Sequence, residues 1–272
     1  MGMEKAMEAQ EDTSRRVMSE AITTRVGAVA LPLGTVLLAV SEAFHPSGED
    51  PMDHSAVFRE YAESDAWTIV HLGQYFGFLL VLGGLVALYY SLAARPGRAA
   101  GLAPFGLAAA VTAAASYTVL QAVDGIALKR AVDAWVGAPA NQATAAFAAA
   151  EAIRWTEIGM NSLSNFLTGL TLLLFGLVVA FGRSYPRWTG WMAVASGCAF
   201  VYNGVVEVAY EGFVPSIVKL LGLALLALWT LVMAFLMWRE AGRRYSSNPE
   251  SAQSGTAHTL PPRSRTAVRR SG

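Results

Sequence analysis

The sequence contains few charged residues and almost no cysteine. Asp, Glu, Lys and Arg together make up 15% of its 272 residues, whereas a soluble protein usually contains about 25%. The single cysteine, Cys198, excludes an intramolecular disulfide and a zinc site built from cysteines. The short motifs of phosphate-binding loops, dinucleotide-binding folds, serine hydrolases and HExxH zinc proteases are also absent. This composition is typical of an integral membrane protein.

Long apolar segments fill most of the chain. A stretch of about 20 apolar residues can cross roughly 30 Å of hydrocarbon as a helix. Helices are expected because backbone groups in lipid must be hydrogen-bonded internally, and because these stretches are too long and uniform for barrel strands. The sequence predicts an all-α, polytopic transmembrane bundle of six helices, at roughly Val26–Phe44, Trp67–Leu92, Gly101–Leu128, Arg154–Phe181, Trp188–Tyr210 and Val214–Trp238.

Basic residues are distributed unevenly between the loops. Arg and Lys near the ends of helices favour the cytoplasmic side. One set of loops and the termini collect most of the arginines, whereas the loop at residues 45–66 has an acidic excess. We therefore predict a cytoplasmic-membrane protein with both termini inside. Residues 1–25 form its cytoplasmic N-terminal segment, residues 26–240 its membrane domain and residues 241–272 a disordered basic tail.

Strongly polar side chains within the six segments gather in the half nearest the outer face. Ionisable groups in a bilayer are costly, so they mark a functional site by default. On the fourth segment Arg154, Glu157 and Asn161 share one face, because each helical residue advances by about 100°. The predicted pocket lining is His71, Gln74, Gln121, Asp124, Arg154, Glu157, Asn161, Asn203, Glu207 and Lys219.

Three interpretations of this outer cluster are open, and two of them use the same cations. The first is a self-neutralised network, because unpaired buried charges are costly. Its cations would be Arg154 and Lys219, and its carboxylates two or more of Asp124, Glu157 and Glu207. The second is a pocket for a small polar or amphipathic ligand, in which either cation binds an anionic group.

The third interpretation is a metal site. His45, His54 and His71 lie near the outer ends of the first two helices. With Glu207 or Asp124 they form a His and carboxylate set suited to zinc or another divalent metal. A metal bound there could activate water for hydrolysis.

The stretch from Gly169 to Gly197 has a layout that other membrane proteins share. An apolar helix ends in a short basic turn with Pro186, and Gly190-Trp191 opens the next helix. Together with the number of helices, this layout resembles a large family of bacterial integral membrane proteins of unknown function. The resemblance covers roughly the last three helices and implies no activity, cofactor or site residue.

The function we expect is binding of a small ligand, in a sensory or accessory role rather than a catalytic one. The alternative is a metal-dependent membrane hydrolase, and a transporter is the second alternative. Transport is less favoured because the inner half offers no matching polar path and no pair of broken helices. The expected partners are the lipid bilayer and the small ligand, and nucleic acid is not among them.

Overall fold

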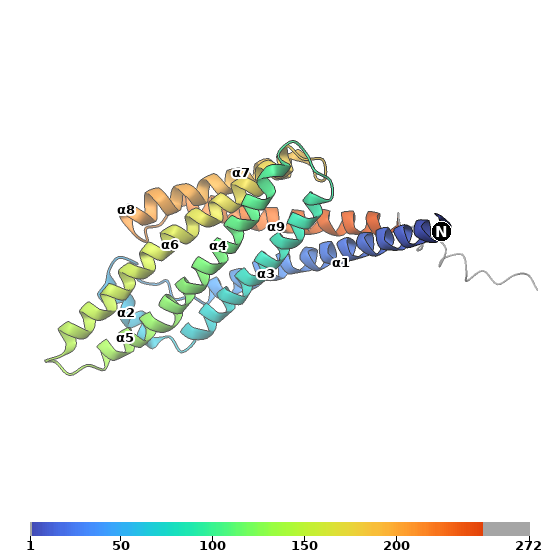
Figure 1. Ribbon diagram of the computed structural model, residues 1–272. Helices are drawn as coiled ribbons and strands as arrows, with labels where there is room; N and C mark the ends of the chain where they lie inside the picture. Colours follow the sequence, from blue (N-terminus) through green and yellow to red (C-terminus); the bar gives the residue numbers. More distant parts are fainter. Residues whose placement is uncertain (1, 247–272) are drawn as a thin grey trace, which may run out of the picture.

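The protein is an all-helical bundle, described by a computed structural model over residues 2–246 (Figure 1). Within these residues six spans are long and apolar enough to cross a membrane, which confirms the predicted number. In chain order these spans are α1 (Gly2–Ala43); α3 (Trp67–Ala93); η1 (Ala100–Leu102) with α4 (Ala103–Ala122), η2 (Val123–Leu128) and α5 (Lys129–Val136); α6 (Ala143–Ala180); α7 (Arg187–Tyr202) with η3 (Asn203–Val208) and α8 (Ala209–Glu211); and α9 (Ile217–Ser246). The short helix α2 (His54–Glu63) lies in the loop after α1.

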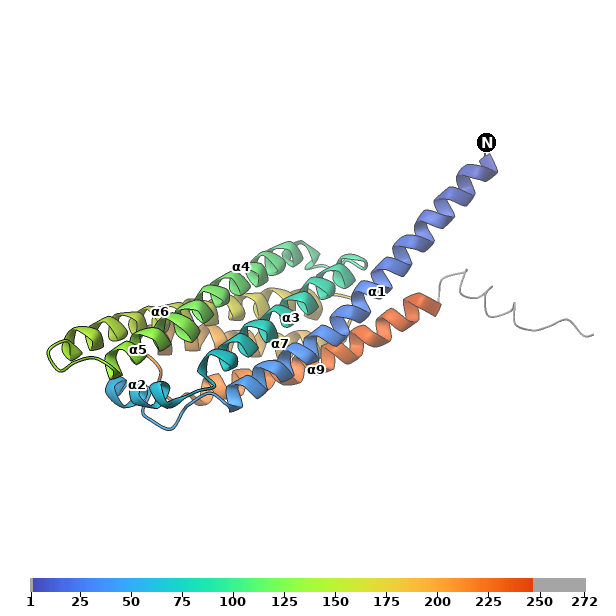
Figure 2. The ribbon, with the colours of Figure 1, turned by 90° about the horizontal axis from the view of Figure 1, so that it is seen from below.

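The six spans form a closed ring in chain order. Each span packs against the next one along the chain, and α9 returns to pack against α1. Figure 2 shows α1 between α3 and α9. Because the number of spans is even, the N-terminus and the end of α9 lie at the same end of the bundle (Figure 1). We call this the arginine end, after Arg95, Arg98 and Arg183 in its two loops and Arg187 at the start of α7, and the opposite end the histidine end, after His45, His54 and His71.

Helices α1 and α3 touch through glycine. A Cβ atom on Gly34 would lie 2.5 Å from the carbonyl oxygen of Gly77, and one on Gly27 would lie 2.2 Å from the Cβ of Ala87. Such distances leave no room for a side chain, so the two backbones are in direct contact. Small residues give this packing in lipid, where the hydrophobic effect does not drive helices together.

Helices α6 and α7 repeat this arrangement. A Cβ on Gly169 would lie 2.7 Å from the Gly197 carbonyl oxygen, and a Cβ on Gly176 would lie 2.8 Å from that of Gly190. On each helix the glycines are two turns apart, so they face the same partner along its length. The stretch from Gly169 to Gly197 is therefore a tight antiparallel helix pair.

Two spans widen into π-helix near the histidine end. These segments are η2, which contains Asp124 and Gly125, and η3, which begins with Asn203 and Gly204. Each widened turn packs on the preceding span through its glycine. A Cβ on Gly125 would lie 2.5 Å from the Cβ of His71, and a Cβ on Gly204 would lie 2.6 Å from the Ser162 carbonyl oxygen. Single π turns within α-helices are frequent at functional sites.

The interior of the ring is apolar toward the arginine end. Trp229, Met233 and Met237 of α9 are fully buried in one cluster with Phe175 of α6 and Leu88 of α3. The polar and ionisable groups of the candidate site lie at the other end of the ring, which is the histidine end.

The first and last helices run past the boundaries that their apolar residues predict. α1 is one continuous helix from Gly2, so residues 2–25 are helical and continuous with the first apolar segment, and α9 continues to Ser246. The remainder of the predicted tail, residues 247–272, lies outside the described residues.

Replacement of Gly169 by Ala tests the α6–α7 contact. The new methyl group would meet the Gly197 carbonyl oxygen and the Val201 amide, both at 2.7 Å, so the helices must separate. We expect a loss of about 1–3 kcal/mol in unfolding free energy, measured by denaturant titration in mixed micelles. Gly159→Ala is the matched control, since it lies on the same helix with no atom within 4 Å of the new Cβ. Equal stability of the two variants would contradict the close contact.

Candidate functional site

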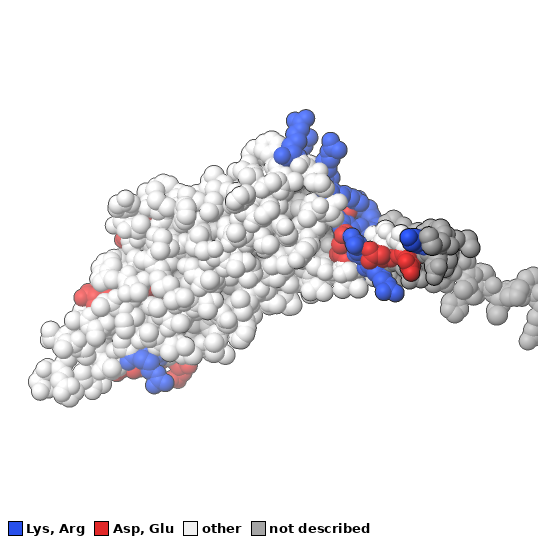
Figure 3. Space-filling model, viewed as in Figure 1, with Lys and Arg blue, Asp and Glu red and all other residues white. Residues whose placement is uncertain are grey.

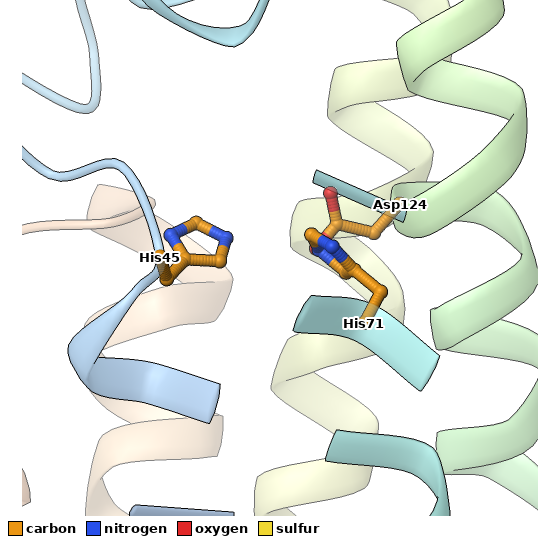
Figure 4. Close-up of side chains that lie close together, drawn as sticks. All are labelled: His45, His71 and Asp124. Atoms are coloured by element: carbon orange, nitrogen blue, oxygen red, sulfur yellow. The ribbon is translucent and has the colours of Figure 1, made fainter. Parts of the chain in front are cut away.

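The centre of the site is a contact between three side chains from three segments (Figure 4). His45 follows α1, His71 lies in the second turn of α3, and Asp124 lies in η2. The Nε2 atom of His71 is 2.9 Å from Oδ2 of Asp124. The two imidazole rings are 5.2 Å apart between centroids. One potential ligand atom from each of the three residues lies within 4.8 Å of the other two.

Trp67 holds this group of three in position. Its indole Nε1 donates to the Asp124 carbonyl oxygen at 3.1 Å, and its own carbonyl oxygen is 2.7 Å from Nδ1 of His71. Its ring lies 4.5 Å from the ring of His71 and 5.1 Å from that of His45. Gly125 lets His71 approach η2, because any larger residue would overlap the His71 Cβ. One tryptophan and one glycine therefore fix both the distance and the orientation of the pair.

His45 enters the group from the loop. Its Nδ1 is 2.9 Å from the Pro46 carbonyl oxygen, and its ring also contacts Tyr61. Burial lowers the pKa of the His45 imidazole below its usual value of 6.5, against the opposing effect of the Asp124 carboxylate. The neutral ring, which has a lone pair on one nitrogen, is thus the favoured form at neutral pH.

Arg154 and Glu157 form a buried ion pair one turn apart on α6. Nη1 of Arg154 donates to both carboxylate oxygens of Glu157, at 2.9 and 2.8 Å, and Nη2 donates to the Pro51 carbonyl oxygen at 3.2 Å. The guanidinium carbon also lies 4.8 Å from the ring centroid of Phe213 and 5.6 Å from that of Tyr61. Both partners are at most 3% exposed, so a large part of the predicted polar face of α6 consists of a neutralised pair.

A chain of amides continues from α6 to η3. The side-chain amide of Asn165 donates to Asn161 at 2.8 Å and to Asn203 at 2.9 Å. Asn203 in turn donates to the Glu207 carboxylate at 2.6 Å, and Ser216 donates to the same carboxylate at 2.7 Å. The Glu207 carboxylate is therefore stabilised by neutral donors.

Lys219 does not have the role that the predicted network gives it, which is to neutralise one of the carboxylates. Its backbone amide donates to the Ser216 hydroxyl at 3.0 Å, close to the start of α9. Within residues 2–246 its ammonium group takes part in no ion pair. The predicted pairing of two cations with the carboxylates is thus found for Arg154 alone.

The remaining predicted residues have separate partners. His54 in α2 is 3.2 Å from the Glu151 carboxylate, away from the group of His45 and His71. Gln74 donates to the Glu42 carboxylate at 3.0 Å. Gln121 is buried on α4, and its Oε1 has no hydrogen-bond partner among the described residues. Of the predicted metal ligands, the structure therefore brings together His45 and His71, with Asp124 rather than Glu207 as the carboxylate.

A second charged cluster lies at the arginine end, where the sequence suggests an apolar interior. Glu240 of α9 is fully buried and accepts hydrogen bonds from Arg243 and Arg244, at 2.8 and 3.1 Å. Arg95, which follows α3, is 2.9 Å from the same carboxylate, and Arg244 also pairs with Glu20 of α1 at 3.1 Å. These pairs connect α1, α3 and α9. The spacing of Glu240, Arg243 and Arg244 at i, i+3 and i+4 was the available sequence signal.

A double-mutant cycle tests the pair on α6. Arg154→Met and Glu157→Gln should each destabilise the protein by about 3–5 kcal/mol, because each leaves a buried charge without its partner. The double variant should lose clearly less than the sum of the two. Unfolding free energies in mixed micelles provide the measurement. The control is the cycle for Asp12 and Arg16, an exposed pair that should show negligible coupling. Additive losses at Arg154 and Glu157 would show that the two charges are not energetically coupled.

Comparison with known proteins adds no function to this geometry. No model of a protein family, no characterised protein and no solved structure matches the chain significantly. The site is therefore interpreted from its own residues, as part of a six-span helical membrane protein with buried charge pairs.

Proposed function

We propose that this protein binds a small polar or amphipathic ligand at its histidine end, in a sensory or accessory role in the cytoplasmic membrane. In this proposal the histidine end faces away from the cytoplasm and both termini are cytoplasmic. The amides are hydrogen-bonded to one another, and Arg154 is paired with Glu157, so this arrangement does not require a catalytic role for either group.

The distribution of arginine supports this orientation. Arginines gather at the end of the bundle that contains the two chain ends, and Figure 3 shows them as the large blue group there. The members in the loops, at the start of α7 and in the last turns of α9 are Arg95, Arg98, Arg183, Arg187, Arg239, Arg243 and Arg244. Because basic residues next to short loops are retained in the cytoplasm, the opposite end is assigned to the outside.

The observation that carries the proposal is a set of unsatisfied polar atoms at the histidine end. Four side-chain atoms there are buried without a hydrogen-bond partner among residues 2–246, namely Nε2 of His54, Oε1 of Gln121, Oδ1 of Asp124 and Nε of Arg154. A buried polar group left unpaired costs about 1–3 kcal/mol. Water or a polar ligand would satisfy these atoms, so they indicate a hydrated binding site rather than a closed network.

Transport is less well supported than binding. Toward the arginine end the ring is filled by large apolar side chains such as Trp229 and Phe175, and the charged groups beyond them are paired around Glu240. A transported ligand would need a polar route through this packed region. A hydrolase has one supporting observation, which is the group of His45, His71 and Asp124.

Labelling of Asn161→Cys tests both the access and the orientation. In a Cys198→Ser background, we expect a membrane-impermeant thiol reagent to react with this variant in intact cells, because Asn161 is half-buried in the polar chain at the histidine end. Ala110→Cys is the control for a packed interior position, since Ala110 is only 2% exposed, and it should not react.

Two loop positions calibrate the same labelling. Ser47→Cys should react in intact cells, whereas Ala94→Cys should react only after permeabilisation, since these exposed residues lie at opposite ends of the bundle. If Asn161→Cys stays unlabelled while Ser47→Cys reacts, the outer cluster is sealed and the binding proposal is wrong. Reaction of Ala94→Cys in intact cells would show that the protein has the opposite orientation in the membrane.

A further inference from the structure

The hydrogen bonds of His71 determine which of its nitrogens carries a proton. A carbonyl oxygen only accepts, so the contact of Nδ1 with the Trp67 carbonyl at 2.7 Å requires a proton on Nδ1. In a neutral ring Nε2 then has the lone pair and cannot donate to the Asp124 carboxylate, which lies 2.9 Å away and also only accepts. Three arrangements resolve this conflict. His71 is doubly protonated, the Asp124 carboxyl group is protonated and donates to Nε2, or a cation is bound by both Nε2 and the carboxylate.

His45 has the same arrangement of its ring. Its Nδ1 faces the Pro46 carbonyl oxygen at 2.9 Å, so the proton of the neutral ring is on Nδ1 and Nε2 keeps its lone pair. Both histidines therefore donate one ring N–H to a backbone carbonyl and leave the other nitrogen available. Histidines that ligate metals typically have this outer hydrogen bond, which fixes the tautomer and the direction of the ring.

The spacing of the donors also fits one ion. Nitrogen and oxygen ligands lie about 2.0–2.2 Å from zinc, so two ligands of one ion are roughly 3.0–3.5 Å apart. The 2.9 Å between Nε2 of His71 and Oδ2 of Asp124 is close to this separation, and the ligand atom of His45 lies within 4.8 Å of both. Asp124 has a second oxygen, Oδ1, which is buried without a partner among residues 2–246.

The charges of the surroundings do not oppose a cation. Glu157 is neutralised by Arg154, and this pair is closed by the two hydrogen bonds to the Glu157 carboxylate. The rings of His45 and His71 contact the uncharged ring of Trp67, His45 also contacts the ring of Tyr61, and His71 contacts the Asp124 carboxylate. A divalent ion would thus meet one anionic and two neutral ligands, a set that suits zinc and neighbouring transition metals.

We propose that His45, His71 and Asp124 bind one divalent transition metal of the zinc class at the histidine end. The ligands are Nε2 of each histidine and the Asp124 carboxylate. Three protein ligands leave at least one coordination position open, so that water or the ligand of the proposed function can complete the shell. This inference rests on the proposed function, because it names the ligand class of the same outer site.

Cobalt binding to the full chain in detergent provides the test. After treatment with a chelator and its removal, titration with Co²⁺ should give visible absorption bands that saturate at one ion per chain, and Zn²⁺ should abolish them. His45→Ala, His71→Ala and Asp124→Asn should each weaken Co²⁺ binding by about 100-fold or more, since loss of an outer hydrogen bond alone costs 10–100-fold. His54→Ala is the matched control and should bind like the wild type, because His54 pairs with Glu151 instead.

Two results would overturn the metal site. One is the absence of Co²⁺ bands in the wild type, and the other is unchanged binding in both His71→Ala and Asp124→Asn. Asp124→Asn keeps the shape of the side chain, and its thermal unfolding without metal shows whether the variant is folded. Labelling of Asn161→Cys separates the two proposals. Labelling without Co²⁺ binding retains the proposed ligand site and rejects the metal, whereas Co²⁺ binding without labelling retains the metal and rejects the wider pocket.

Discussion

Direct contact between helix backbones is the constraint on which this structure depends. Lipid does not drive apolar helices together, so their association depends on van der Waals contact at short range. Gly34 faces the Gly77 carbonyl oxygen on α3, and Gly169 faces that of Gly197 on α7. These contacts make two rigid antiparallel pairs, α1–α3 and α6–α7, and α4 and α9 connect the pairs into a ring. The polar residues therefore lie on a scaffold whose helix spacing is fixed by glycine.

The two π turns link this scaffold to its chemistry. In η2 the glycine contact is with His71, and Asp124 precedes that glycine by one residue. In η3 the corresponding contact is with Ser162, and Asn203 precedes the glycine. Each wide turn brings a polar side chain to the inside of the ring while its glycine packs on the preceding span. The same local geometry thus supplies the carboxylate of the histidine group and one amide of the Asn165 chain.

Much of the fold follows from the sequence, and less of the site does. The six spans follow from the length of the apolar runs, and the pair of Arg154 and Glu157 follows from helical spacing. The sequence alone does not distinguish the group of His45, His71 and Asp124 from the other possible sets of histidines and carboxylates. Which carboxylate lies beside His71 depends on a π turn, and the position of His45 depends on how the loop after α1 folds back. Spacing along α9 contained the signal for the Glu240 cluster, but its contact with Arg95 depends on tertiary packing.

The central claim is that the histidine end forms one metal-binding group from three segments. X-ray absorption of the zinc-loaded protein tests this claim most directly. We expect a first shell of nitrogen and oxygen at about 2.0–2.1 Å, with the outer-shell scattering of two imidazole rings. Replacement of His45 by Ala should remove one of these rings, while replacement of His54 should remove none. A shell of oxygen atoms alone, or a spectrum unchanged in His45→Ala, would contradict it.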